Sequence, residues 1–324
     1  MARMLKMGPS PHVRTNETVE KVMYDVIIAL LPALLMAVYV FGIQALTTTL
    51  IAVGTCMATE GIMQKIMGKD IDIKDGSAII TGILFAFIVP VTMAYWIVIV
   101  GSMISILLGK MLFGGLGHNI FNPALVGRAF VQASWPVAIT TFVLDGQAGP
   151  TMLDAMKRGL DGTLIAGKNI SVDPQTGKLL LKGTDYMNAL LGKMGGSIGE
   201  VSALALLLGG AYLIYRGQIN WKVPAIIIGT VGVGAFLFGG DPIMHMLSGG
   251  LFLGAFFMAT DMVTSPYTEK GQMIFAFGIG ILVTLIRFKG GYPEGMAYSI
   301  LIMNGVVPLI NKYTKPKLFG GVAK

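Results

Sequence analysis

The sequence predicts an all-α polytopic membrane protein of about ten transmembrane helices, arranged as two inverted five-helix repeats with broken helices. Hydrophobic residues make up 54% of the chain, charged residues only 13%, and the mean hydropathy is +0.73. A soluble domain contains about 25% charged residues. Apolar stretches of spanning length recur along the chain, and two pairs of similar stretches recur in the same order. In hydrocarbon every backbone polar group needs an internal partner, so the spans must be helices.

The apolar stretches come close to the roughly 20 residues that a helix needs to cross about 30 Å of hydrocarbon. We place them at 24–43, 45–63, 77–93, 94–109, 120–144, 200–215, 222–239, 243–260, 271–287 and 295–311. The first is too long for the apolar part of a cleavable signal peptide. Only the stretch between the fifth and sixth spans is long and polar, so we expect it outside the hydrocarbon.

Lysine and arginine residues gather in the short connections on one side of this arrangement, and the positive-inside rule places that side in the cytoplasm. The predicted organisation is a cytoplasmic N-terminal segment at 1–23, a first five-helix repeat at 24–144, an extracytoplasmic loop at 145–199, a second five-helix repeat at 200–311 and a cytoplasmic tail at 312–324. In a bacterium the membrane is then the cytoplasmic (inner) one.

Two pairs of similar stretches indicate the repeat. TGILFAFIVP at 81–90 is similar to SGGLFLGAFFMATDMVTSP at 248–266, and the glycine-rich break at 113–130 is similar to the one at 289–305. An odd number of spans in each half forces the two halves into opposite orientations. In inverted repeats a shared site lies near the midplane. The alternative is that Gly-Leu-Phe strings recur by chance in an apolar chain.

The composition excludes several classes of function. The net charge of +7 comes mostly from residues that flank the spans, without the aromatic residues of a nucleic-acid surface, so we expect no nucleic-acid partner. Cys56 is the only cysteine, so a disulfide within the chain and a cysteine-ligated cluster are both excluded. His12, His118 and His245 show no ligand spacing. We expect no metal site.

The break GGLGHNIFNPALVGR is the first candidate site. Asn122 is a good N-cap and Pro123 suits the first turn of a helix, so a half-helix begins here inside the membrane. Its positive end suits a phosphate or the carbonyl of a flavin ring. Asn119 lies just before it, and Arg128 follows at a depth where a charge needs a partner. The alternative is a plain break, with Arg128 extending toward the interface.

Three acidic residues lie nearest the hydrocarbon: Glu60, Glu200 and Asp261. Carboxylates in membranes often mark ion paths. However, all three lie near predicted span ends, where a solvated carboxylate costs little, so both interpretations stay open.

The polar stretch that opens the loop contains Thr151 behind a Gly149-Pro150 step. We predict that Thr151 is the N-cap of a helix over MLDAMKRG, with Asp154 at the capping-box position. No base is spaced to activate its hydroxyl, so another protein would have to modify it.

Four motifs in order carry a family resemblance: GGLGHNIFNPALVGRAF, DGQAGPTMLDAMK, GGSIGEVSALALLLGG and SGGLFLGAFFMATDMVTSP. Together they resemble RnfD, the D subunit in the membrane part of the Rnf electron-transport complex. The same family contains the B subunit of the sodium-pumping NADH:quinone reductase. The resemblance runs from about Asp25 to Lys312, and the chain lacks the long N-terminal extension of the quinone reductase subunit.

The resemblance implies that Thr151 carries FMN through a phosphoester bond installed by a flavin transferase. In the family's pattern an Asp is followed, after two residues, by Ser-Gly-Ala-Thr. Asp145, Gly149 and Thr151 match this pattern, whereas Ala148 replaces its serine and Pro150 its alanine. Some members hold a further noncovalent flavin such as riboflavin. We would place such a flavin at the half-helix that includes Asn119, Asn122 and Arg128.

The resemblance also implies other Rnf subunits as partners, both membrane subunits and soluble ones that carry flavin and iron–sulfur clusters. The predicted function is that of a membrane subunit of an ion-translocating ferredoxin:NAD oxidoreductase, which relays electrons through the covalent FMN and couples this to transport of Na⁺ or H⁺. Such a chain would not be active alone. The alternative is a secondary transporter or small-solute channel without a redox cofactor, which inverted repeats would suit equally well.

Overall fold

The computed structural model describes residues 18–71, 73, 75–144, 147–149, 151–158, 183–192 and 195–316. Within these ranges the chain is helical apart from connecting segments and one short two-stranded hairpin. Four helical segments are long and apolar enough to cross a membrane, and further apolar helices are shorter. The predicted all-α polytopic membrane fold is therefore confirmed.

The described helices fall into two consecutive sets, separated by short elements that follow the first set. The first set is α1 (Val19–Phe41), α2 (Ile43–Ile66), α3 (Ser77–Phe87), α4 (Tyr95–Gly109) with the 3-10 turn η1 (Met111–Phe113), α5 (Pro123–Ser134) and α6 (Pro136–Thr140). The second set is α9 (Ala203–Tyr215), α10 (Lys222–Leu237), α11 (Pro242–Leu247), α12 (Leu251–Leu253) with the π-turn η2 (Gly254–Met258), α13 (Glu269–Phe288) and α14 (Met296–Thr314).

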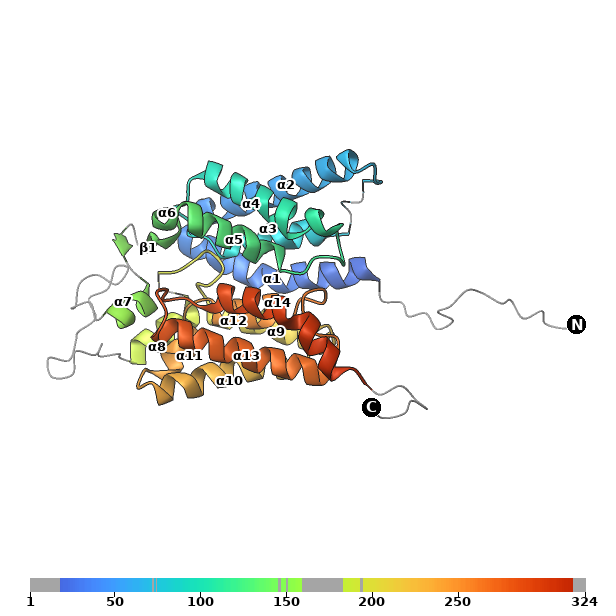
Figure 1. The fold of residues 1–324 in the computed structure, drawn as a ribbon. Helices are drawn as coiled ribbons and strands as arrows, with labels where there is room; N and C mark the ends of the chain where they lie inside the picture. The colour runs from blue at the N-terminus through green and yellow to red at the C-terminus, as the bar shows by residue number, and fades with distance from the viewer. Residues whose placement is uncertain are drawn as a thin grey trace, which may run out of the picture.

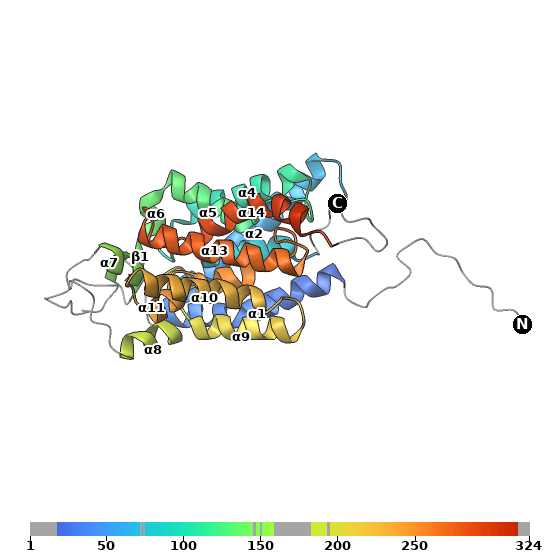
Figure 2. The ribbon, with the colours of Figure 1, turned by 60° about the horizontal axis from the view of Figure 1, so that its bottom comes forward.

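Between the two sets lie β1 (Phe142–Leu144), β2 (Gln147–Gly149), α7 (Met152–Arg158) and α8 (Gly183–Leu191). The two strands pair antiparallel, with Phe142 opposite Gly149. In Figures 1 and 2 these elements gather at one end of the bundle, and α1 begins and α14 ends at the other.

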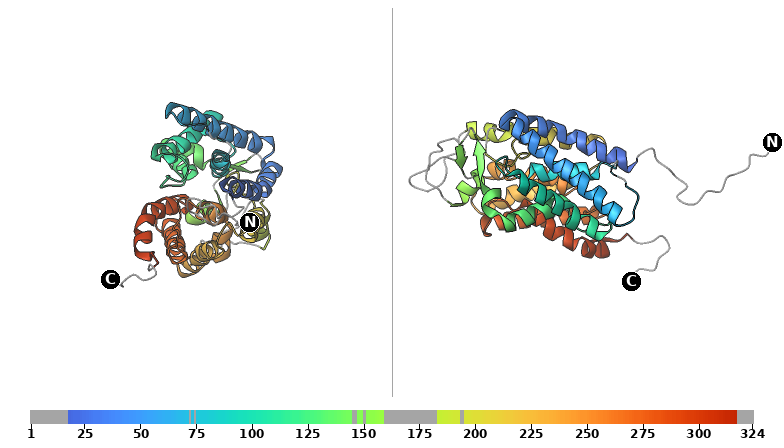
Figure 3. Two further views of the ribbon diagram at one scale, coloured as in Figure 1. Left: turned by 90° about the vertical axis from the view of Figure 1, so that its right-hand side faces the viewer. Right: turned by 90° about the horizontal axis from the view of Figure 1, so that it is seen from above.

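The two sets form two bodies that run in opposite directions. Seen along the helices, the blue-to-green helices gather on one side and the yellow-to-red helices on the other (Figure 3, left). Equivalent helices also have equivalent neighbours: α2 packs on α3 and α4 in the first body, and α10 packs on α11 and α13 in the second. α1 and α9 pack against each other where the bodies meet. This is the geometry of an inverted repeat.

Glycines allow the helix backbones to approach closely. A Cβ at Gly209 of α9 would lie 2.0 Å from the Ala29 carbonyl oxygen of α1, and one at Gly82 of α3 would lie 2.5 Å from Cα of Val53 in α2. Small residues at such crossings are typical of membrane bundles, where packing replaces the hydrophobic effect as the driving force.

α3 ends well inside the bundle. Its 11 residues cover about 16 Å, roughly half of the hydrocarbon thickness. The segment that leads into α9 supplies partners for the carbonyls beyond its end: the N–H of Gly199 donates to Phe87 O at 2.9 Å, and the N–H of Ile198 donates to Val89 O at 3.1 Å. Non-helical backbone at this depth is tolerated because protein surrounds it.

Three predicted spans differ from the structure. The span at 77–93 was predicted too long, because α3 stops at Phe87. The span at 120–144 begins with the half-helix α5, which stops at Ser134 because Pro136 has no N–H and excludes helical geometry at Trp135; the predicted range also includes β1. The span at 243–260 is broken into α11, α12 and η2. Its break contains Gly249 and Gly250, both at positive φ, which ends a helix at little steric cost.

Candidate functional site

Thr151 lies at the start of α7, at the end of the bundle that carries the hairpin. Its Oγ1 accepts a hydrogen bond from the N–H of Asp154 at 3.3 Å, so the predicted N-cap is confirmed. The residue is only 6% exposed. The Thr151 hydroxyl, to which the family pattern attaches the flavin, is therefore held in a defined position and is shielded from solvent.

Lys157 holds α7 against the second body. Its Nζ donates to three carbonyl oxygens near the end of α13, those of Ile286 (3.2 Å), Gly290 (2.5 Å) and Tyr292 (2.7 Å). A cation is favourable there because the last carbonyls of a helix lack intrahelical partners. Burial lowers the pKa of the Lys157 ammonium, and the Asp154 carboxylate opposes the shift.

The other elements around Thr151 are also anchored. Gly149 pairs with Phe142 in the hairpin, and Tyr186 of α8 donates to Asp241 Oδ2 at 2.5 Å. That hydrogen bond, followed by burial, raises the pKa of Tyr186 to about 12. Asp145 and Pro150, the other positions of the attachment pattern, lie outside the described residues.

A cavity lies beside Thr151. Its walls come from α7, α8, the segment that leads into α9, the α11–α12 loop and the loop before α14. The lining residues are Thr151, Met152, Leu153, Ala189, Gly195, Gly196, Glu200, Val201, Leu247, Ser248, Gly249 and Glu294. Three of them are glycines, and a Cβ at Gly196 would meet nothing within 4 Å. The cavity is therefore open beside Gly196 and is lined by two carboxyl groups, those of Glu200 and Glu294.

Arg128 lies buried behind this cavity, with its side chain 8% exposed. Its Nη2 lies 2.7 Å from Glu294 Oε2, and its Nη1 donates to Ile88 O at 2.7 Å and lies 3.6 Å from Glu200 Oε1. Ile88 is the residue between Phe87 and Val89, so the guanidinium completes the capping of α3. Arg128 is thus paired inside the protein, and the alternative of extension toward the interface is wrong.

Arg287 plays the corresponding part in the second body. Its Nη1 donates to His245 O at 2.5 Å, and its Nη2 donates to Ser248 O at 3.0 Å and Gly249 O at 3.3 Å. These carbonyls lie at the end of α11, where that broken helix lacks partners. Two buried arginines therefore stabilise the two helix breaks that face the Thr151 cavity.

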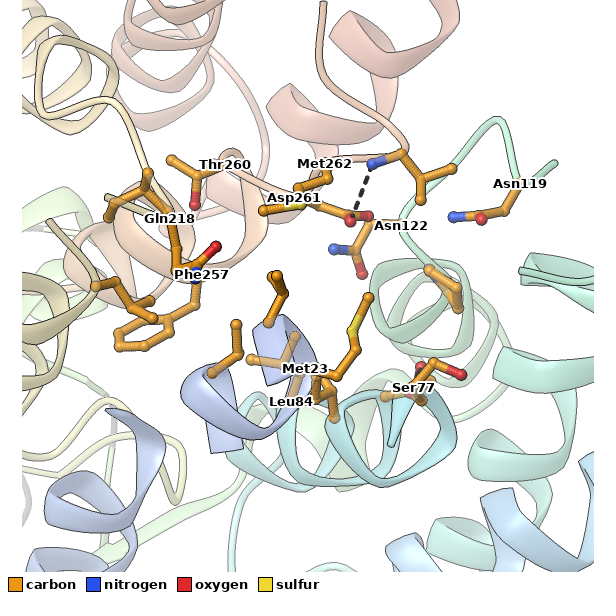
Figure 4. Close-up of a pocket in the computed structure, with 18 of the residues that line it drawn as sticks. Met23, Ser77, Leu84, Asn119, Asn122, Gln218, Phe257, Thr260, Asp261 and Met262 are labelled. Atoms are coloured by element: carbon orange, nitrogen blue, oxygen red, sulfur yellow. Dashed lines mark hydrogen bonds between the residues drawn. The ribbon is translucent and has the colours of Figure 1, made fainter. Parts of the chain in front are cut away.

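A second cavity lies between the two bodies, toward the end where α1 begins. It has a volume of about 100 Å³. The first body contributes Asn119 and Asn122, and the second contributes Phe257, Thr260 and Asp261, as Figure 4 shows. We refer to it below as the inner cavity.

Asn122 caps α5 as predicted. Its Oδ1 accepts from the N–H groups of Ala124 (3.1 Å) and Leu125 (3.5 Å). The buried Asn304 of α14 meets the same turn: with its amide turned to match its neighbours, its oxygen accepts from the Asn122 N–H at 3.1 Å and its nitrogen donates to Thr264 O at 3.3 Å. The start of the half-helix is thus fixed by the opposite body.

The structure separates residues that the sequence analysis had grouped. Asn119 and Asn122 line the inner cavity, whereas Arg128 points toward Glu294 and Glu200 behind the Thr151 cavity. The sequence reasoning missed Glu294, the closest carboxylate partner of Arg128. The signal was available, because a charge inside a bundle requires a partner and Glu294 lies in the glycine-rich break of the second repeat.

Glu60 also has a partner that the sequence reasoning missed. Lys110 Nζ lies 2.6 Å from Glu60 Oε1, donates to Ser77 Oγ at 2.5 Å and lies 3.9 Å from Asp75 Oδ2. The side chains of Lys110 and Glu60 are 2% and 1% exposed. The interpretation of Glu60 as a solvated carboxylate at a span end is therefore wrong.

The similarity of this chain to known proteins extends over almost its whole length. The model of the NQR2, RnfD, RnfE family matches residues 6–320. The chain is 47% identical over 325 residues to the D subunit of the proton-translocating ferredoxin:NAD(+) oxidoreductase complex of Clostridium ljungdahlii, covering 97% of this chain and 96% of the relative. It is 46% identical over 320 residues to the D subunit of the Na(+)-translocating ferredoxin:NAD(+) oxidoreductase complex of Acetobacterium woodii, covering 98% and 95%. A third relative, the D subunit of the ion-translocating oxidoreductase complex of Stutzerimonas stutzeri, is 36% identical over 95% of this chain and 94% of its own length. The chain therefore belongs to the NQR2, RnfD, RnfE family.

Proposed function

We propose that this chain is RnfD, the D subunit in the membrane part of an ion-translocating ferredoxin:NAD oxidoreductase complex. The main observation behind this proposal is nearly full-length similarity, at 46–47% identity, to two relatives named as that subunit. The broken-helix, inverted-repeat bundle suits a membrane subunit and the transporter alternative equally well, so the sequence similarity decides between them. The chain acts with the other membrane subunits and the soluble flavin and iron–sulfur subunits, and has no activity alone.

We propose further that Thr151 carries FMN through a phosphoester bond. The hydroxyl lies at a helix N-cap and lines a cavity whose wall is open beside Gly196. Bound flavin would supply one- and two-electron transfer. The residues of the chain hold the attachment point: Lys157 fixes α7, and the hairpin and α8 flank it.

The covered hydroxyl sets a requirement for attachment. Because Thr151 is 6% exposed and its Oγ1 caps α7, a flavin transferase reaches it only when α7 is released from α13. In this proposal the transferase acts before α7 docks or on a form in which α7 has opened.

The orientation of the chain is part of the proposal. The basic residues around Lys21, Lys65, Arg216 and Lys312 lie on the cytoplasmic side of a bacterial inner membrane, so both termini are cytoplasmic. Thr151 then lies on the outer side, and the electron path crosses the membrane.

The inner cavity is the proposed site of a second, noncovalent flavin such as riboflavin. Its lining is mostly apolar, with amide groups from Asn119 and Asn122 that can form hydrogen bonds with a ring system. Replacement of Asn122 by Ala is expected to lower the amount of noncovalent flavin extracted from the purified chain. Unchanged flavin content in this variant would contradict the assignment of this cavity.

In-gel fluorescence tests the covalent flavin. The chain is expressed with a flavin transferase, denatured, separated on a gel and examined for flavin fluorescence, with intact-mass analysis of the same band. We expect fluorescence and the mass increase of one FMN in the wild type, and neither in Thr151→Ala. The matched control is Thr140→Ala, an exposed threonine near the same end of the bundle, which should label like the wild type.

Absence of flavin from a wild-type chain made with its transferase would remove the redox assignment, leaving the transporter alternative ahead. Fluorescence that survives in Thr151→Ala would show that the flavin is attached at another residue.

The transported ion, Na⁺ or H⁺, is identified by a separate experiment in vesicles. It tests whether ferredoxin-driven uptake requires sodium and whether a protonophore abolishes it.

A further inference from the structure

Glu200 is the most enclosed carboxyl group of the Thr151 cavity. It lies outside the helices, in the segment that joins α8 to α9, and its side chain is 6% exposed. A Cβ at Gly250 would lie 2.3 Å from Glu200 Oε1, so the glycine at this positive-φ position makes room for the carboxyl. The Glu200 carboxyl thus fits a space left by Gly250, and it lines the same cavity as Thr151.

The charge of an ionised Glu200 is poorly compensated. Among the described residues, Arg128 forms an ion pair with Glu200 at 3.6 Å, and it makes closer contacts with Glu294 and with Ile88 O, both at 2.7 Å. The hydrogen bonds of the other nearby cation, Arg287, go to backbone carbonyls. Two carboxyl groups therefore face two guanidinium groups that are already engaged by backbone carbonyls, and the repulsion between the two carboxylates favours a proton on one of them.

The groups that face Glu200 act in different directions. Burial and then the neighbouring Glu294 raise the pKa of Glu200 to about 8, while Arg128 opposes the shift. Arg287, from α13, interacts electrostatically with both carboxyl groups. Glu200 is therefore placed to change its protonation state when a charge nearby changes.

We propose that Glu200 is a proton-exchanging residue that responds to the charge of the group carried on Thr151. This inference rests on the proposed attachment of FMN. Bound flavin would supply the change in charge: added negative charge there would lead the Glu200 carboxylate to take one proton from solvent, and loss of that charge would return the proton to solvent. No bond other than the carboxyl O–H forms or breaks in this step.

Redox-difference infrared spectroscopy tests the proposal on the full chain that carries flavin, with dithionite as the electron donor, at pH values on both sides of 8. The wild type should gain absorption of a protonated carboxyl group on reduction. Glu200→Gln, compared at equal in-gel flavin fluorescence, should lose this band. Glu269→Gln is the matched control, because this carboxyl is paired with Lys222 at the opposite end of the bundle, and it should keep the band.

A second readout separates proton exchange from a structural role. The midpoint potential of the flavin should depend on pH in the wild type, and this dependence should be weaker in Glu200→Gln. An unchanged infrared band and an unchanged pH dependence in a flavin-loaded Glu200→Gln chain would overturn the inference while leaving the proposed function intact. Absence of flavin from wild-type Thr151 would instead overturn the proposed function, and this inference with it.

Discussion

Arg128 of α5 and Glu294, just before α14, form a buried ion pair of 2.7 Å between the two bodies. The contact has a counterpart: Asn304 of α14 accepts a hydrogen bond from the N–H of Asn122, just before α5. In each case a side chain on the fifth helix of one repeat holds the start of the fifth helix of the other. The inverted repeat is thus fastened at two places by reciprocal polar contacts.

The Arg128–Glu294 pair should be costly to break. Arg128→Met leaves two buried carboxyl groups and the Ile88 carbonyl without the guanidinium, and we expect a loss of about 3–5 kcal/mol in the free energy of unfolding. The double variant Arg128→Met/Glu294→Gln should be less destabilised than the sum of the single variants, with a coupling of about 0.5–3 kcal/mol. Unfolding in detergent, followed by tryptophan fluorescence, measures each change.

The exposed pair formed by Lys222 and Glu269 is the control for that cycle. Lys222→Met should change stability little, because solvent screens this pair. Strict additivity of the Arg128 and Glu294 variants would contradict their direct coupling.

Release of α7 should control flavin attachment. Lys157→Met removes the three hydrogen bonds that fix α7 to the end of α13, so the Thr151 hydroxyl should become accessible more often. We expect faster attachment when a purified transferase acts on the folded, flavin-free chain, measured by the growth of in-gel fluorescence. Lys270→Met, an exposed lysine at the opposite end of α13, is the control. Equal rates in the two variants would show that docking of α7 does not limit attachment.

Gly209 should tolerate no side chain. The Cβ of an alanine at this position would lie 2.0 Å from Ala29 O, so α1 and α9 would have to separate. We expect a loss of about 1–3 kcal/mol or more from this overpacking. Gly229→Ala in α10 is the matched control, because its Cβ would meet nothing within 4 Å, and it should be neutral or stabilising by up to about 1 kcal/mol. Thermal unfolding in the same detergent compares the two, and equal melting temperatures would contradict the close crossing.

Glu200 should make stability depend on pH. The pKa of its carboxyl is raised from 4.5 to about 8 in the folded chain, so its favourable contribution is fully present below pH 4.5 and is lost as the pH rises through 8. Wild-type stability should therefore fall between these pH values by more than that of Glu200→Gln. Melting temperatures measured at several pH values test this, and parallel curves for the two proteins would show that Glu200 has an ordinary pKa.

Much of this fold could be predicted from local sequence. Apolar length gave the positions of the spans, and the Asn122-Pro123 and Thr151 caps were recognisable because capping depends on residues three or four apart. The third span was predicted too long, and the fifth and eighth were wrong as continuous helices, because an apolar composition does not reveal where the backbone is interrupted, as it is at Trp135-Pro136 and Gly249-Gly250.

The partners of the buried charges could not be predicted in the same way. Arg128 and Glu294 are separated by 166 positions, and Lys110 and Glu60 by 50, so their pairing depends on how the bodies pack. Inverted symmetry could have directed attention to Glu294. It could not have separated Arg128 from Asn119 and Asn122, because helix rotation decides which cavity each side chain reaches.

The capping of α3 by Ile198 and Gly199 has a consequence for biosynthesis. The ribosome synthesises the first body completely before it reaches Ile198 and Gly199, whose N–H groups bind the carbonyls at the end of α3. Until then, the carbonyls of Phe87 and Val89 lack these partners inside the membrane. A fragment that stops after α6 should accordingly be degraded in cells. Supplying the remainder as a separate polypeptide that begins ahead of Gly195 should rescue it, whereas a remainder that begins at α9 should not.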